Sequence, residues 1–443
     1  MRTDRPIGVD LFAGAGGLSL GFEQAGFDVL TAVEIDPVHA SVHHYNFPEC
    51  AVIPKSVQEL TGPEIRAASS IGDRPVDVVF GGAPCQGFSL IGKRALDDPR
   101  NALVKDFVRI VAELEAGYFV FENVKGLTVG RHRKFLDELM AEFESAGYDV
   151  VADWKVLNAS SYGVPQNRER LFLLGARRGL PLPGYPEPTT LEAGASPELL
   201  LPNGPSCREA LEDLPDAESF EQLLTSDEVT VGDWAGRSPY ARLMRCDEPE
   251  SWYYGYKRLW ERERLTSSMR TDHTPVSRVR FAETLPGTVE PISRFFKLNP
   301  RRASNTLRAG TDASRGAFTS PRPIHYKYNR CITVREMARL HGFPDWFRFH
   351  CTKWHGARQI GNAVPPPLAR AVAASVIAAM GMRPARPRRM VDLGNSGLLK
   401  FDMREAANHW NVPPPPGKRD RKSGATKRSQ SETEAERLRK LAS

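Results

Sequence analysis

The chain of 443 residues lacks any apolar run long enough to cross a membrane, and it contains only six cysteines. Neither an 18-residue apolar span nor an apolar N-terminal segment is present, which argues against a membrane helix and against export. The cysteines include no C-x-x-C pair, so a disulfide framework is not expected. These absences favour a cytoplasmic protein in a reducing compartment.

A metal site and a site for phosphoryl transfer are also not indicated. His350, Cys351 and His355 cluster in the sequence, but a fourth ligand at zinc-finger spacing is missing. His39 and His43 lie four residues apart on an expected helix, where an exposed face is the simpler interpretation. No Gly-Lys-Ser/Thr follows the glycine-rich loop near the N-terminus. We therefore expect neither a bound metal nor phosphoryl transfer.

Charge is unevenly spread along the chain. Lys and Arg number 60 against 54 Asp and Glu, a formal net charge of +6. Beyond residue 382 there are 15 basic against 7 acidic residues, which leaves 45 against 47 in residues 1–382. A nucleic-acid face on this nearly neutral body must come from local clustering. Residues 404–410 could form one short helix, whereas the stretch from residue 413 is typical of a disordered basic segment.

The chain does contain a thiol on a rigid turn directly after a strand. Residues 78–80 form a short apolar run bounded by glycines, as in a buried parallel strand, and the Gly-Gly-Ala-Pro ending at Pro84 cannot continue it. Cys85 is thus expected at the carboxyl edge of a strand, where open α/β sheets build their sites. A lone cysteine is more often a small buried apolar residue, so the segments around Cys85 must decide whether it is a nucleophile.

A glycine-rich loop lies upstream at residues 13–17. Residues 7–12 predict a first strand and residues 18–25 a helix whose amino end faces the loop. Glu34 follows Gly14 by 20 residues, at the end of a second apolar run, where a carboxylate can bind ribose hydroxyls. The loop alone is a weak signal that leaves a nicotinamide dehydrogenase open.

Two further segments carry polar groups toward the same edge. Residues 118–124 predict a buried strand bearing Glu122 and Asn123, and burial would raise the pKa of Glu122 enough to hold a proton near neutral pH. Alternatively, Glu122 caps the next turn or pairs with Lys125. In residues 161–173, three polar side chains alternate and share one face, either toward the site or as a solvated edge strand. They are Gln166, Arg168 and Arg170.

In this order the segments resemble the cytosine-5 DNA methyltransferase family, over residues 7–176 and about 300–380. The resemblance implies an α/β fold with a doubly wound, mostly parallel sheet of the S-adenosylmethionine-dependent methyltransferase type and a smaller target-recognition domain. It also implies S-adenosylmethionine as cofactor and double-stranded DNA as partner. The motifs are DLFAGAGG at 10–17, PCQ at 84–86, ENV at 122–124, QNRER at 166–170, RASNTLR at 302–308 and QIGNAVPP at 359–366.

The resemblance assigns roles residue by residue. Cys85 would attack cytosine C6, Glu122 would meet N3, and Arg168 or Arg170, best Arg170, would meet O2. Asn123 would hold the turn at Pro84 and Cys85. The implied cofactor contacts are Phe12, Gly14, Gly16, Glu34, Ile35, Pro84, Leu103, Asn362 and Val364. The implied DNA contacts are Gln86, Ser89, Lys93, Arg94, Gln166 and Thr306, with residues 86–99 as a mobile loop over flipped-out DNA. In place of the family's usual acidic residue against adenine, this chain has Ser56.

The motif positions predict four parts of the chain. Residues 1–182 would form the catalytic and cofactor-binding domain, and residues 183–310 the target-recognition domain, whose aromatic residues are individually expected to be core. Residues 311–382 would return to the catalytic domain, and residues 383–443 would be a basic, largely disordered tail. We expect a monomer associated with the nucleoid, and a cognate restriction nuclease or other defence proteins as partners.

Other functions fit the residues less well. An RNA methyltransferase with its own Pro-Cys turn would carry a second catalytic cysteine, and none lies between Cys85 and Cys207. The tRNA-modifying branch of the family stays open, although the large region 189–300 favours duplex recognition. A catalytically dead DNA-binding regulator would not need its Cys85, Glu122 and arginine pair intact. A dehydrogenase leaves the Pro-Cys turn unexplained.

Overall fold

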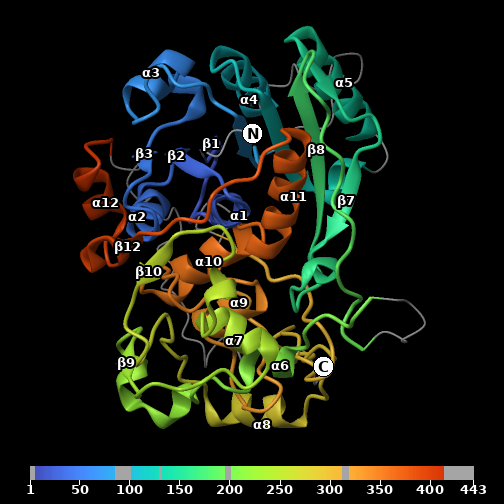
Figure 1. Ribbon diagram of the computed structural model, residues 1–443. Coiled ribbons are helices and arrows are strands. Elements are labelled where there is room, and N and C mark those ends of the chain that lie inside the picture. Colours follow the sequence, from blue (N-terminus) through green and yellow to red (C-terminus); the bar gives the residue numbers. More distant parts are fainter. Residues whose placement is uncertain (1–4, 85–100, 129–131, 195–200, 312–318, 414–443) are drawn as a thin grey trace, which may run out of the picture.

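A computed structural model describes residues 5–84, 101–128, 132–194, 201–311 and 319–413, which form an upper lobe around a sheet and a lower lobe of short helices and loops (Figure 1). The upper lobe holds an eight-stranded sheet in the order β3-β2-β1-β4-β5-β8-β6, with β7 paired to β8. Pairs from β3 to β5 are parallel, and β8 is antiparallel to β5, β6 and β7. The expected doubly wound, mostly parallel sheet is confirmed. The strands are β1 (Ile7–Leu11), β2 (Asp28–Val33), β3 (Ala51–Ile53), β4 (Val78–Gly81), β5 (Tyr118–Val124), β6 (Tyr148–Val150), β7 (Lys155–Asn158) and β8 (Glu169–Arg177).

Helices cover both faces of this sheet. On one face, α1 (Gly17–Ala25) packs with α11 (Pro366–Ala379), which returns from the far end of the chain, and both bury apolar side chains against β4 and β5. The other face is covered by α3 (Gly62–Ala67), α4 (Ala102–Glu113) and α5 (His132–Ser145). Buried apolar residues line both faces of the central strands, as parallel sheets require.

The lower lobe is built from short elements joined by loops. Its helices are α6 (Cys207–Leu211), α7 (Pro239–Arg245), α8 (Pro275–Glu283) and α9 (Val334–Leu340), and β9 (Val229–Thr230) pairs with β11 (Arg264–Leu265). Residues 331–349, expected in the catalytic domain, share an apolar cluster with residues 207–265 and with α2 (Pro37–Asn46), so the two lobes have one continuous core. Next to that core, α10 (Lys353–Asn362) leads back to α11. The 3-10 turns are Val57–Glu59, Lys125–Thr128, Ala159–Tyr162, Ala217–Ser219, Glu221–Leu224, Pro249–Trp252 and Ser396–Leu399.

Buried ion pairs add to the apolar cluster in holding the short elements of the lower lobe together. Arg339 is fully buried between Asp213, at 3.1 Å, and Asp345, at 2.6 Å. Arg330 is equally buried and pairs with Glu336 at 2.8 Å. Aromatic residues pack among these arginines: the Arg245 guanidinium lies 3.8 Å from the Trp234 ring centroid, and Trp252 stacks on Trp346. Trp234, Trp252 and Trp260 are half-buried against the apolar cluster, whereas Tyr254 is exposed, so the prediction of core aromatic residues is confirmed only in part.

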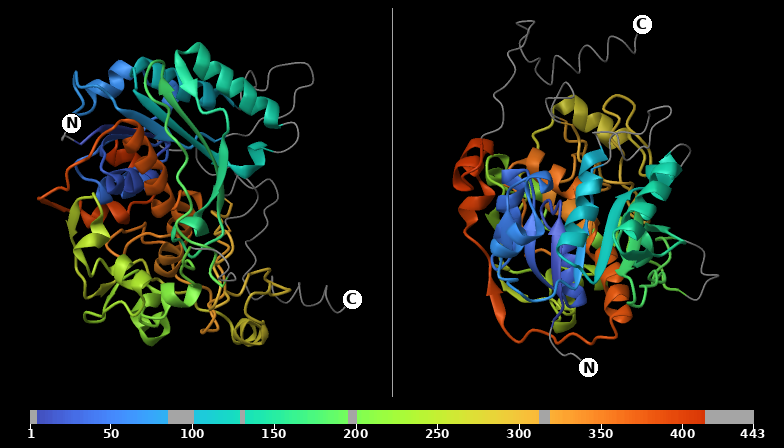
Figure 2. Two further views of the ribbon diagram at one scale, coloured as in Figure 1. Left: turned by 45° about the vertical axis from the view of Figure 1, so that its right-hand side comes forward. Right: turned by 90° about the horizontal axis from the view of Figure 1, so that it is seen from above.

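The prediction of a largely disordered tail from residue 383 is wrong for residues 383–413, which we call the strap, although the short helix predicted at 404–410 is present. Its strand β12 (Met390–Asp392) pairs with β10 (Lys257–Leu259) of the recognition region. Its helix α12 (Met403–His409) packs on α2, where Trp410 donates to Ser41 Oγ at 2.9 Å. Figure 2 shows this red segment running along the blue part of the upper lobe. Burial of Leu399, Ala406 and Ala407 outweighs the local excess of charge.

The expectation that His39 and His43 form an exposed face is also wrong, because α2 is covered by the strap and the lower-lobe core. The two side chains are 5 % and 0 % exposed, and His43 Nε2 lies 3.0 Å from Ser19 Oγ. Burial lowers the pKa of His43 to about 3. In the described ranges, no cluster of three His, Cys, Asp or Glu side chains could hold a metal ion. Nor is any helix within them long and apolar enough to span a membrane.

Candidate active site

The candidate site is built on the carboxyl ends of β4 and β5, which lie side by side in the sheet. A Cβ on Gly82 would lie 2.5 Å from Glu122 Oε2, so only glycine lets this carboxyl group approach the backbone after β4. Asn123 donates from Nδ2 to the Ala83 carbonyl at 2.8 Å. Two side chains of β5 thus contact the two residues before Pro84, Gly82 and Ala83. Cys85, the expected nucleophile, lies outside the described residues.

Glu122 faces an arginine and not the lysine that was its alternative partner. Arg170 Nε lies 2.9 Å from Glu122 Oε1, and both side chains are almost buried. Lys125 instead pairs with the exposed Glu169. Burial raises the pKa of Glu122, while the charges of Arg170 and Arg168 oppose the rise. The site therefore holds a carboxyl group that takes up a proton more readily than an ordinary glutamate does.

The two arginines of the alternating segment have different partners in the structure. Arg168 is 1 % exposed and donates to the carbonyls of Leu307, at 3.1 Å, and Gly361, at 2.8 Å. Arg168 therefore links the start of β8 to the segments that contain Leu307 and Gly361, whereas Arg170 contacts Glu122. The face that carries Arg168 is therefore not that of a solvated edge strand. A buried guanidinium needs hydrogen-bond partners, and the two carbonyl groups supply them.

Gln166, expected to contact DNA, is fully buried and has its side chain engaged inside the protein. Its Oε1 accepts from Leu307 N at 3.1 Å, and its Nε2 donates to His341 Nδ1 at 2.9 Å. This side chain is therefore engaged inside the protein, and its contact with DNA stays a prediction. Thr306, by contrast, is exposed and donates to the Asn167 carbonyl at 2.6 Å.

His341 is a residue of this network that the sequence did not single out. Its Nε2 lies 3.0 Å from the Ala363 carbonyl, so the ring bridges Gln166 to the segment holding Asn362 and Val364. Burial lowers the pKa of His341 well below its usual value, and a neutral ring can accept from Gln166 and donate to Ala363. Only tertiary contacts reveal this role, since nothing in the local pattern marks the residue.

The loop after β1 forms a cradle together with the end of β2. Glu34 accepts at its two oxygens from Gly14 N and Asp36 N, each at 2.8 Å, which holds its carboxylate at the sheet edge. Gly14 has φ +56° with no atom within 4 Å of an added Cβ, so open space lies before it. Phe12 adopts a left-handed φ of 63°, and Ile35 is 65 % exposed. An uncovered apolar side chain beside a carboxylate fits a nucleoside, with the ring on Ile35 and the ribose on Glu34.

The returning segment closes the cradle from the other side. A Cβ on Gly17 would lie 2.5 Å from the Val364 carbonyl, so helix α1 and the residues after Asn362 are in close contact. Asn362 itself is exposed. Ser56, which stands where an acidic residue was expected, is nearly buried and accepts from Gln58 N at 3.3 Å. Its hydroxyl therefore caps a local turn.

Some expected residues cannot be placed in this site. Gln86, Ser89, Lys93 and Arg94 fall, like Cys85 and the expected loop at 86–99, outside the described residues. Pro84 is exposed at the end of the described segment, and Leu103 lies half-buried at the start of α4. Pro84 follows the carboxyl end of β4, and Leu103 packs against the apolar cluster that includes Val79 of that strand.

The mixed sheet and the site at its carboxyl edge define an S-adenosylmethionine-dependent methyltransferase fold. The chain belongs to the C-5 cytosine-specific DNA methylase family, whose model matches residues 8–378. It is 56 % identical over 408 residues to the Type II methyltransferase M.XorII of Xanthomonas oryzae pv. oryzae, covering 92 % of this chain and 93 % of that protein. It is 34 % identical over 372 residues to M1.HphI of Haemophilus parahaemolyticus, covering 83 % and 86 %.

Solved structures agree with this assignment. A prophage-encoded DNA modification methyltransferase of E. coli superposes with a TM-score of 0.65 at 30 % identity, covering 85 % of this chain and 100 % of that one. Dnmt2 of S. pombe shares the fold with a TM-score of 0.53 at 16 % identity, covering 85 % and 100 %. The protein is a DNA cytosine-5 methyltransferase of the Type II group.

Proposed function

We propose that the protein methylates C5 of a flipped-out cytosine within a specific sequence of double-stranded DNA, through a covalent bond between Cys85 and C6. The observation that carries this proposal is the contact between Glu122 and Arg170 beside the residues that lead to Pro84. It brings a proton donor and a cation next to residues 82–84, which Cys85 follows in the sequence.

Cytosine C5 is a poor nucleophile until the conjugation of the ring is broken. Attack of the Cys85 thiolate on C6 forms a C–S bond and moves negative charge toward C5, N3 and O2. A protonated Glu122 donates to N3, and Arg170 stabilises the charge at O2. After the methyl group has been attached, a base removes the C5 proton, the ring electrons return and Cys85 leaves as thiolate.

The side chains around Glu122 serve this sequence of steps. The raised pKa of Glu122 favours the protonated form before attack. The Arg170 guanidinium favours thiolate over thiol at a nearby cysteine. Asn123 holds the Ala83 carbonyl and so limits movement of the turn that bears Pro84 and Cys85. Asn123 is thus a positioning residue.

S-adenosylmethionine, when bound, would supply an electrophilic methyl group. The cradle fits its nucleoside, because Ile35 offers an uncovered apolar surface and Glu34 offers a carboxylate held at the sheet edge. Val364, packed behind Gly17, would close the site. The residues that would hold the cofactor are Phe12, Gly14, Gly16, Glu34, Ile35, Pro84, Leu103, Asn362 and Val364.

We further propose that the target base leaves the duplex, because a thiolate must approach C6 from above the ring and a stacked base blocks that path. The similarity to Type II methyltransferases supports a role in restriction and modification, with a cognate nuclease as partner. A base-resolution map of 5-methylcytosine in DNA from cells that express the protein would identify the sequence.

Trapping the covalent intermediate tests the mechanism. DNA carrying 5-fluorocytosine at the target cannot lose a proton from C5, so it should retain the wild-type protein after methyl transfer. Cys85→Ala should trap nothing. An adduct mapped to another cysteine, or full activity of Cys85→Ala, would contradict the proposal.

Glu122→Gln tests the proton donor. We expect kcat to fall by about 10²- to 10⁴-fold while DNA affinity is kept, because the proton is needed mainly in the transition state. Glu169→Gln is the matched control, since Glu169 lies on neighbouring β8 but is exposed and paired with Lys125. Equal activity of the two variants would remove Glu122 from the catalytic residues.

A further inference from the structure

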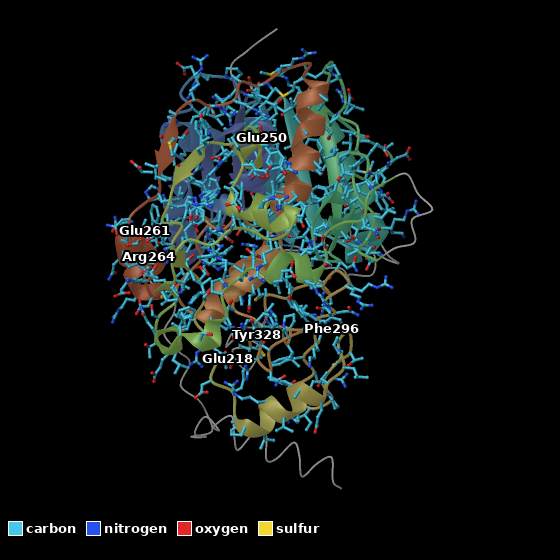
Figure 3. The ribbon with its side chains drawn as sticks, turned by 60° about the horizontal axis from the view of Figure 1, so that its bottom comes forward. Glu218, Glu250, Glu261, Arg264, Phe296 and Tyr328 are labelled. Carbon is cyan, nitrogen blue, oxygen red and sulfur yellow. The ribbon has the colours of Figure 1, made fainter. Side chains whose placement is uncertain are left out.

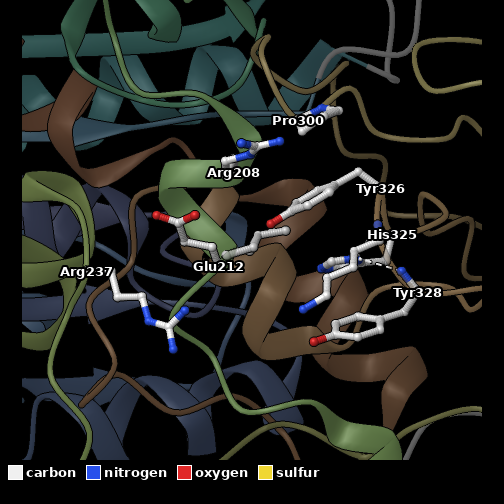
Figure 4. Close-up of a pocket in the computed structure, with 9 residues that line it drawn as sticks. Arg208, Glu212, Arg237, Pro300, His325, Tyr326 and Tyr328 are labelled. Atoms are coloured by element: carbon white, nitrogen blue, oxygen red, sulfur yellow. Dashed lines mark hydrogen bonds between the residues drawn. The ribbon is translucent and has the colours of Figure 1, made fainter.

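The lower lobe contains a pocket of about 400 Å³ that lies outside the candidate active site. It opens between α6, the loop before α7 and the turn at residues 325–328. Figure 3, with the lower side of the molecule forward, shows Tyr328 on that side. In Figure 4 the side chains of Arg208, Glu212 and Arg237 stand opposite those of His325, Tyr326 and Tyr328.

One wall of the pocket is a stack of three rings. His325 lies between Tyr326 and Tyr328, with ring centroids 4.5 and 4.6 Å away. His325 Nδ1 accepts from the backbone N–H groups of Lys327, at 2.9 Å, and Tyr328, at 3.2 Å, which holds the turn (Figure 4). Burial lowers the pKa of His325 to about 4, so the ring is neutral and can accept both bonds. The wall is therefore rigid.

The charged residues of the pocket differ from most of those elsewhere in this lobe in their lack of ion-pair partners among the described residues. Arg208, Glu212, Arg237 and Lys327 make no ion pair with any residue that the structure describes, even though Arg208 and Glu212 are four apart across α6. Most other arginines of the lobe have a carboxylate partner, as Arg339 does. Three cations and one carboxylate thus face the pocket with their hydrogen-bonding groups available.

The pocket is connected to the candidate active site by a short path. Pro300 lines the pocket, and four residues later the Ser304 carbonyl accepts from Asn167 N at 2.8 Å. Asn167 precedes Arg170 by three residues. At 3.3–3.6 Å per residue, this path places the pocket at most ~30 Å from Arg170, or fewer than about nine base-pair steps of ~3.4 Å.

We propose that this pocket reads the major-groove edge of a G·C base pair in the DNA sequence that the protein methylates. The inference rests on the proposed function. Arg208 or Arg237 would donate to guanine O6 and N7, and Glu212 would accept from cytosine N4, the pairings that each edge favours. Glu212 argues against a simple phosphate clamp, because a carboxylate repels a phosphate at the same distance. Lys327, at the rim, would contact the backbone.

The experiment compares methylation maps. Wild type, Arg237→Ala and Glu212→Ala each methylate a library of random-sequence DNA, and every 5-methylcytosine is read with its neighbours. We expect both variants to lose discrimination at the same base-pair position, by about 5- to 150-fold, and to keep the remaining positions. Arg388→Ala is the control, since Arg388 is exposed on the strap, and it should keep the wild-type sequence.

The outcomes separate the pocket from the chemistry. An unchanged sequence in active Arg237→Ala and Glu212→Ala would overturn the inference alone. A uniform loss of rate at all sites with a smaller salt dependence of binding would also overturn it, because that is the signature of a phosphate contact. A wild-type protein that methylates no cytosine would overturn the proposed function and this inference together. Both side chains are exposed, so thermal unfolding should match wild type in each variant.

Discussion

The two lobes of this methyltransferase are held together in different ways. The upper lobe buries nearly continuous apolar strands between helices, and its core contains stacked rings such as Phe119 on Phe143. The lower lobe, beside its apolar cluster, buries guanidinium groups that pair with carboxylates, as Arg339 and Arg330 do. An apolar core tolerates conservative substitutions, because apolar contacts do not require a fixed direction between two groups. A core of buried ions depends on each partner, because one missing charge leaves the other unpaired.

The largest expected effect tests that dependence. Asp345→Ala removes a carboxylate shared by Arg339, at 2.6 Å, and by Arg335 and Arg245, at 3.8 Å. We expect a loss of about 3–5 kcal/mol in the free energy of unfolding, measured with urea. The control is Asp272→Ala, because Asp272 is 80 % exposed and 3.9 Å from Arg278, a pair worth about 0–1 kcal/mol. Similar small losses of unfolding free energy in both variants would show that the lower lobe does not depend on its buried ion pairs.

Acid should weaken the lower lobe through Glu336. Burial opposes its ionisation, but the charge and hydrogen bonds of Arg330 outweigh burial and lower the pKa of Glu336 to about 2. A lowered carboxyl pKa contributes stability above the unfolded value of 4.5, and that stability is lost as the pH falls toward 2. The stability advantage of wild type over Glu336→Gln should shrink by about 2 kcal/mol between pH 5 and pH 3. A constant difference across that range would contradict the role of Glu336.

The same contrast explains how much the sequence could predict. In the upper lobe, strands follow from short apolar runs and glycines, so the predicted strands at 78–80 and 118–124 are confirmed, and Glu122 lies on the second of them. In the lower lobe, Asp213 and Arg339 meet across 126 residues, and no local period marks such a pair. Gln166 shows the same limit, because no local pattern marks the hydrogen bonds that its side chain makes with His341 and Leu307.

A conservative change in the upper lobe should cost much less. Ile110→Val removes one methylene from a fully buried side chain on α4, and we expect a loss of about 0.5–1.5 kcal/mol in the free energy of unfolding. Ile35→Val is the matched control for stability, since Ile35 is 65 % exposed, and it should change stability by less than about 0.5 kcal/mol. A loss at Ile110 as large as that at Asp345 would show that the upper core is no more tolerant than the lower one.

The smallest expected effect on stability comes from deleting residues 414–443, which lie outside the described residues. Residues 413–443 carry nine Lys and Arg against four Asp and Glu, so their removal should weaken DNA binding at low salt. The slope of log K against log salt should fall by about 0.9 for each DNA phosphate that the tail no longer neutralises, while the methylated sequence stays the same. An unchanged slope would favour a solubilising tail or a docking site for a protein partner. An altered sequence would assign the tail to the recognition region.

The strap has a consequence for how the protein is made. Strand β12 can pair with β10, and α12 can cover α2, only after residues 390–409 have left the ribosome. Chains fold from the N-terminal end as they emerge, so the sheet can assemble while its partner lobe is still incomplete. Until residues 390–409 have been synthesised, the edge at Lys257–Leu259 and the face of α2 that the strap covers are exposed. The strap can therefore bind only after α2 and β10 have been synthesised. A nascent chain stalled before residue 390 exposes the surfaces of α2 and β10 that the strap covers.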